Sequence, residues 1–85
     1  MKKLTKIEKL ALEIELELHT DDIEQCLEYA RDDLEQGYIT EHETSKGITA
    51  HYFDGEKEAI AFCEEGFIRV YWEEQAEEFC LGNLY

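Results

Sequence analysis

The chain has 85 residues, a formal net charge of −14 and 44% hydrophobic residues. A chain this short buries only about 60% of the surface that it exposes when unfolded, which is near the lower limit for one stable domain. This length disfavours a large enzyme with a deep cleft, and the hydrophobic and aromatic content argues against disorder. We therefore expect residues 1–85 to form a single acidic domain.

Acidic residues outnumber basic residues 22 to 8, and four of the lysines lie within residues 1–9. A nucleic-acid binder needs clustered Lys and Arg to displace counterions from phosphates, and the rest of this chain is anionic. Anionic membranes would repel it, and no apolar run approaches the ~20 residues that span a bilayer. The composition predicts a cytoplasmic protein that binds neither nucleic acid nor membranes directly.

The three cysteines are odd in number and widely spaced, which is typical of free thiols in a reducing compartment. The alternative is a metal site built from Cys63, Cys80 and a histidine, but zinc ligands usually occur in close pairs. The carboxylates also lack the regular spacing of a calcium-binding loop. The sequence therefore predicts no metal and no cofactor.

The first segment, residues 4–18, fits two hydrophobic periods. Apolar residues three and four apart predict a helix, whereas the alternation of Leu or Ile with Glu from residue 12 is typical of a strand. We favour a helix because Thr5 followed by Glu8 resembles a capping box and glutamate is a poor strand former. In this helix Leu12 and Leu16 leave the main apolar face and need another surface, such as a second copy of the chain.

The clearest helix covers residues 22–36. Asp21 followed by Glu24 fits an N-terminal capping box, and Gly37 fits a left-handed C-terminal cap. One face carries the apolar side chains that we expect in the core, namely Ile23, Cys26, Leu27, Ala30 and Leu34.

Beyond Gly37 the hydrophobic period drops to two, which predicts strands over residues 38–43, 47–53, 57–63 and 67–73. Asp-Gly at 54–55 suits a two-residue type I′ turn, and Glu-Glu-Gly at 64–66 suits a three-residue turn. The predicted fold class is α+β: two N-terminal helices packed on a four-stranded antiparallel β-meander, with a short C-terminal helix over 73–80. The side chains expected to face the helices are Ile48, Ala50, Tyr52, Ile60, Phe62, Ile68, Val70 and Trp72.

The strongest functional candidate is the outer side of the second helix. A helical wheel places five carboxylates within about 80° of one another, opposite the core stripe; they are Asp21, Glu24, Glu28, Asp32 and Glu35. Like charges at i, i+4 cost about 0.2–0.5 kcal/mol per pair, so helix stability does not favour this arrangement. The seven carboxylates of residues 21–35 give one charge per about 3 Å of helix, close to the roughly 3.4 Å per phosphate of one DNA strand.

A second acidic cluster lies near the end of the chain beside Tyr71, and its residues are Glu73, Glu74, Glu77 and Glu78. Acidic groups beside large aromatic rings are typical of interfaces, in which the rings anchor the partner and the charges select it. We expect Tyr71 and Tyr85 to be exposed, and Trp72, which alternates with Ile68 and Val70, to be buried.

Catalytic motifs are absent from the sequence: it has one serine, no phosphate-binding glycine loop and no nucleophile elbow. His51 and Cys63 are the remaining candidates for a catalytic pair, but a lone strand histidine is usually structural. We therefore predict a protein that is not an enzyme.

In size, acidity and lack of catalytic motifs, the chain resembles phage-encoded inhibitors, among them anti-CRISPR proteins, uracil-DNA glycosylase inhibitors and anti-restriction DNA mimics, and also bacteriocin immunity proteins. This resemblance is one of composition and assigns no role to individual residues. The sequence favours a DNA-mimic inhibitor that binds the basic surface of a nucleic-acid-binding enzyme or defence complex.

Two alternatives differ in kind from an inhibitor. One is an interaction or regulatory module, homodimeric through Leu12 and Leu16, in which the acidity serves only solubility. The other is a small metal-dependent or thiol enzyme.

Overall fold

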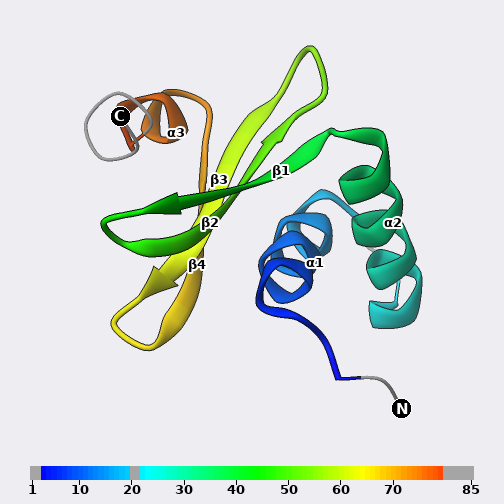
Figure 1. The fold of residues 1–85 in the computed structure, drawn as a ribbon. Helices are drawn as coiled ribbons and strands as arrows, with labels where there is room; N and C mark the ends of the chain where they lie inside the picture. Colours follow the sequence, from blue (N-terminus) through cyan, green and yellow to red (C-terminus); the bar gives the residue numbers. More distant parts are fainter. Residues whose placement is uncertain (1–2, 20–21, 80–85) are drawn as a thin grey trace.

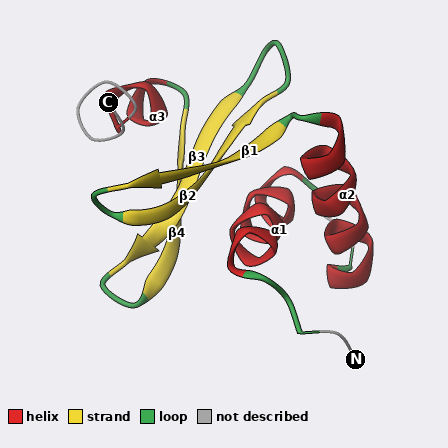
Figure 2. Cartoon of the chain, in the orientation of Figure 1, coloured by secondary structure: helices red, strands yellow, loops and turns green. Residues whose placement is uncertain are grey.

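The computed structural model describes residues 3–19 and 22–79, with the backbone alone for residues 77–79. The strands form one antiparallel sheet in the order β1-β2-β3-β4, a meander with helices on both of its faces (Figures 1 and 2). This arrangement confirms the predicted α+β class and the short C-terminal helix. The elements are α1 (Lys6–Leu18), α2 (Ile23–Gln36), β1 (Ile39–Thr44), β2 (Gly47–Phe53), β3 (Glu58–Glu64), β4 (Phe67–Trp72) and α3 (Glu74–Phe79).

The first segment is a helix, as predicted, and it begins with the expected capping box. Glu8 N donates to Thr5 Oγ1 at 3.2 Å, and Thr5 N donates to Glu8 Oε1 at 2.9 Å. These two bonds satisfy amide groups that have no partner inside the first helical turn.

α1 is the central helix, because it contacts β2, β3 and β4 on one side and α2 on another (Figure 1). We expected Leu12 to need another surface, such as a second copy of the chain, and this chain itself covers it, because Leu12 is only 7% exposed. Leu16 is half-buried. A helix covered on two sides needs apolar residues over much of its circumference, which explains why residues 4–18 also fit a strand pattern.

α2 begins one residue later than predicted, because its N-terminal cap is Asp22, whose Oδ1 accepts from Gln25 N at 2.8 Å. Asp21, the predicted cap, lies outside the described residues. Gly37 ends the helix in the left-handed conformation, as predicted. Ile23 is 60% exposed rather than in the core. Side chains tilt toward the N-terminus of a helix, so one at the first helical position points past the end of α2.

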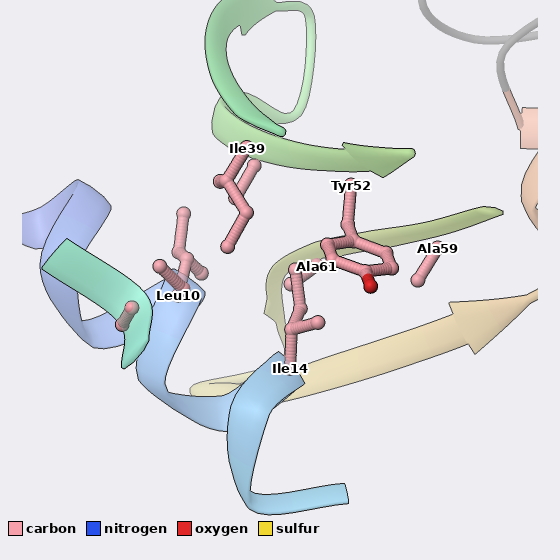
Figure 3. Close-up of a cluster of buried hydrophobic side chains, with 9 residues drawn as sticks. Leu10, Ile14, Ile39, Tyr52, Ala59 and Ala61 are labelled. Atoms are coloured by element: carbon pink, nitrogen blue, oxygen red, sulfur yellow. The ribbon is translucent and has the colours of Figure 1, made fainter. Parts of the chain in front are cut away.

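The sheet register overturns part of the predicted core. Ala50 pairs with Ala61 and Tyr52 pairs with Ala59, so these alanines, and not Ile60 and Phe62, share the face that α1 covers. Figure 3 shows this cluster, in which side chains of α1 meet the sheet. Its labelled members are Leu10, Ile14, Ile39, Tyr52, Ala59 and Ala61.

Ile60 and Phe62 are buried on the opposite face of the sheet, where they form a second cluster with Ala76 of α3. The fold therefore has three layers: the α1–α2 pair, the sheet and α3 (Figure 1). A strand that is covered on both faces, such as β3, has no alternation of polar and apolar residues to show which side chains face α1. The predicted inward positions of Ile60 and Phe62 were wrong for this reason.

Two turns also differ from their predicted types. Phe53 pairs with Glu58, so the β2–β3 loop has four residues instead of two. Glu64 pairs with Phe67, and the two-residue loop between them has positive φ at both Glu65 and Gly66, as type I′ requires.

Candidate functional site

The outer face of α2 carries four exposed carboxylates, which we call the α2 ridge: Glu24, Glu28, Asp32 and Glu35. α2 lies outside α1, at the edge of the molecule (Figure 1). The helix places these residues opposite Cys26 and Ala30, which are buried. Asp21, the fifth predicted member, lies outside the described residues.

The α2 ridge is not neutralised by the cations that the structure describes. The ion pairs among residues 3–19 and 22–79 involve Glu8, Glu15, Glu58 and Glu64, and none involves a ridge carboxylate. Glu28 Oε2 accepts a weak hydrogen bond from the amide of Gln25 at 3.4 Å. The four residues of the α2 ridge therefore carry one sign of charge.

Arg31 is a residue of this surface that the sequence reasoning missed. It lies three residues after Glu28 and four before Glu35, so helical spacing alone would let it neutralise the ridge. Its Nε instead donates to Glu8 Oε2 on α1 at 3.0 Å. The hydrogen bond from the Thr5 backbone and the bond from Arg31 lower the pKa of Glu8. The helical spacing marks Arg31 as a neighbour of the ridge, but its partner on another helix is not visible in the sequence.

The charge density of the ridge is lower than predicted. Asp22 is used as the helix cap, and the half-buried Asp33 forms a hydrogen bond with Glu15. Because Asp21 lies outside the described residues, four carboxylates remain on residues 24–35, a length of about 18 Å, or one per about 4.5 Å. The predicted value of one per about 3 Å counted every acidic residue, whichever side of the helix it occupies.

The C-terminal acidic cluster does not join the α2 ridge. Glu73 and Glu74 are exposed, but α3 packs on the face of the sheet opposite to α1 and α2 (Figure 1). Glu77 and Glu78 belong to α3, and their side chains lie outside the described residues. One flat partner surface could not contact both clusters.

Tyr71 is half-buried, so the prediction that it is exposed is wrong, whereas its contact with a partner stays a prediction. Its ring stacks on Phe62 with centroids 5.6 Å apart, and its hydroxyl donates to Glu64 Oε1 at 2.7 Å. This hydrogen bond raises the pKa of Tyr71. Trp72 packs against the main core as a half-buried residue, and Tyr85 lies outside the described residues.

His51 and Cys63 do not form a catalytic pair. The register pairs His51 with Ile60 and Cys63 with Ile68, which places the two side chains on opposite faces of the sheet. His51 Nε2 lies 2.9 Å from Glu58 Oε2. The described side chains contain no group of three or more His, Cys, Asp or Glu that could hold a metal ion, and Cys80 lies outside them.

Comparisons with known proteins add no assignment. No protein-family model, curated protein or solved structure matches this chain. None of the helices that the structure describes is long and apolar enough to cross a membrane. The case for a function therefore depends on the chemistry of the described surface.

Proposed function

We propose that the protein is a small acidic inhibitor that binds, through the α2 ridge, the basic nucleic-acid-binding surface of another cytoplasmic protein. Its target would be a nucleic-acid-binding enzyme or defence complex, in line with the resemblance to DNA mimics such as anti-CRISPR and anti-restriction proteins. The observation that carries this proposal is the row of four exposed carboxylates that form no ion pair with the described cations.

Carboxylates can replace phosphates at such a surface because Arg and Lys make charge-assisted hydrogen bonds to both groups. A helix with its side chains is about 10–12 Å across, a width that suits a groove lined with cations. Opposite charges also speed the encounter and select the partner, and salt weakens both effects. The binding is therefore expected to weaken steeply as the salt concentration rises.

The proposal excludes α3 from the same contact, because α3 lies on the far side of the sheet from α2. It also does not use Asp33, whose carboxyl group contacts Glu15. The predicted contact surface is therefore the α2 ridge alone, with Asp21 as its predicted extension.

The test compares two triple variants with equal changes in charge. The first, Glu24→Lys with Glu28→Lys and Asp32→Lys, reverses the ridge. The second reverses three exposed carboxylates that do not belong to α2, at Glu41, Glu43 and Glu56. Each variant is used to capture proteins from a lysate at low salt, and duplex DNA and RNA are then added to compete.

The proposal expects the native chain and the second variant to retain the same nucleic-acid-binding protein, and the ridge variant to lose it. Added nucleic acid should release the captured protein. Equal capture by both variants, or a captured protein that nucleic acid does not release, would contradict the proposal. Circular dichroism of both variants checks that the helices are retained.

A further inference from the structure

Glu15 is a carboxyl group enclosed between the two N-terminal helices. Its side chain is 1% exposed, and its Oε2 has no hydrogen-bond partner among the described residues. The thiol of Cys26 on α2 donates to the backbone oxygen of Glu15 at 3.9 Å, which places Glu15 at the contact between α1 and α2. An ionised carboxylate in such a place is costly unless a cation or several donors compensate it.

The groups that face Glu15 do not supply that compensation. Asp33 of α2 shares a hydrogen bond with the Glu15 side chain. Burial raises the pKa of Tyr52 of β2, and the charges of both carboxyl groups also act on Tyr52 and raise its pKa further. The hydroxyl of Tyr52 donates to Asp54 at 2.8 Å rather than to Glu15. His19, the C-terminal cap of α1, has its Nε2 3.9 Å from Glu15 Oε2; this is too far for a hydrogen bond, and the contact is an ion pair only when His19 is protonated.

Two carboxyl groups can form a hydrogen bond only when one of them carries a proton, since ionised carboxylates are acceptors alone. Burial, the hydrogen bond with Asp33 and the charge of Asp33 raise the pKa of Glu15 to about 8. The buried pair therefore holds one proton at neutral pH, and the carboxyl group that carries it donates to the other.

We propose that the proton shared by Glu15 and Asp33 holds α2 against α1, and that α2 separates from α1 when this proton is lost at alkaline pH. α2 rests on α1 and touches β1, so its position depends on the α1 contact. Loss of the proton leaves two like charges in contact within a buried site. The inference concerns the fold and does not depend on the partner of the α2 ridge.

The sign of the pH dependence follows from the direction of the shift. Below about pH 4.5 the Glu15 carboxyl is protonated in both folded and unfolded chains, so this site contributes no pH dependence to the stability. Between about 4.5 and 8 only the folded chain holds the proton, so its stability falls as the pH rises. One proton changes the unfolding equilibrium by at most about tenfold per pH unit.

A direct test is a carbon-13 NMR titration of the native full-length chain from pH 4 to 10. The Glu15 carboxyl carbon is expected to titrate near pH 8, and the methyl signals of Ala30 and Leu34 on α2 should shift with the same midpoint. The methyl group of Ala76, across the sheet, is the internal control and should not follow that midpoint. A Glu15 midpoint near 4.5, or α2 methyl signals that do not follow Glu15, would overturn the proposal.

A pair of variants gives a second readout by denaturant unfolding between pH 5 and 8. Glu15→Gln replaces the O–H with an amide N–H that can donate to Asp33 at any pH, so this variant should lose much of the native pH dependence. Glu13→Gln removes an acidic group from the same helix and should keep that dependence. If the free energy of unfolding changes with pH in the same way in the native chain and in Glu15→Gln, the proposal is overturned. If Glu15→Gln does not fold, the carbon-13 titration of the native chain is the test.

Discussion

The guanidinium group of Arg31 on α2 is held 3.0 Å from Glu8 on α1, so the cation of α2 is bonded to the neighbouring helix. Arg31 is the one Lys or Arg in the sequence of α2. Its position between Glu28 and Glu35 would otherwise allow it to pair with the ridge. The contact between α1 and α2 thus helps to keep the ridge negative.

Replacement of Arg31 by Gln is expected to strengthen the attraction of the ridge for cations, and Glu8→Gln to weaken it by freeing Arg31 to approach the ridge. Each change should alter the affinity for a fluorescent oligolysine peptide by about twofold, the size of one helical charge pair. Fluorescence anisotropy at low salt measures this affinity. Arg69→Gln removes the same charge from β4, far from α2, and a change as large as that of Arg31→Gln would contradict the local effect.

The two faces of β3 are expected to respond differently to mutation. Ala61 lies under α1 with no exposed surface, so Ala61→Leu should overpack the contact and cost about 1–3 kcal/mol. Phe62→Ala should leave a cavity beside α3 and cost about 3–5 kcal/mol. Denaturant unfolding gives both values. Phe67→Ala, at a site that is 69% exposed, is the control and should change stability by less than about 0.5 kcal/mol. A neutral Ala61→Leu would mean that this alanine does not set the distance between helix and sheet.

The elements of the fold could be predicted because their signals are local: the Thr5–Glu8 capping box, Gly37 at a helix end, and hydrophobic periods of two. The inward face of β3 could not be chosen by side-chain size. In an antiparallel hairpin, a loop of two or four residues pairs an even residue with an odd one, so Ala50 requires an odd-numbered partner on β3. That rule selects Ala59 and Ala61 over the larger residues next to them.

Only the features of the candidate site that depend on α2 alone could be predicted from the sequence. The wheel placed the α2 ridge on the outside, and its described members are exposed. Contacts between elements were not visible in the sequence: Asp33 meets Glu15 of α1, Arg31 meets Glu8, and Tyr71 stacks on Phe62. Each contact joins residues that are distant in the sequence or on different strands. The periodicity of a single helix or strand does not predict such contacts.

Gly37 is expected to be required at the end of α2. Its φ of 87° lies in the left-handed region, and a Cβ added there would meet no atom within 4 Å. The cost of Gly37→Ala is therefore conformational, about 1–2 kcal/mol in the free energy of unfolding. Gln36→Ala, one residue earlier and still helical, is the matched control and should be close to neutral. Equal effects of the two substitutions in thermal or denaturant unfolding would contradict this explanation.

Asp54 is expected to govern the stability of the β2–β3 loop in acid. Its Oδ1 accepts from Lys57 N at 2.7 Å and from Glu56 N at 2.9 Å, and its Oδ2 accepts from the Tyr52 hydroxyl at 2.8 Å. These bonds, led by the one from Lys57, lower the pKa of Asp54 below its usual 3.8. A lowered pKa adds stability that is present above about pH 4 and is lost as the pH falls through the folded value.

Asp54→Asn should therefore reduce the loss of stability between pH 4 and pH 2, because the side chain can no longer gain a proton in this range. The measurement is denaturant unfolding at several acidic pH values and constant ionic strength. Glu56→Gln removes an exposed carboxylate from the same loop and should leave the slope close to that of the native chain. If the two variants have the same slope, the loss reflects the net charge of the chain, and the hydrogen bonds to Asp54 do not account for it.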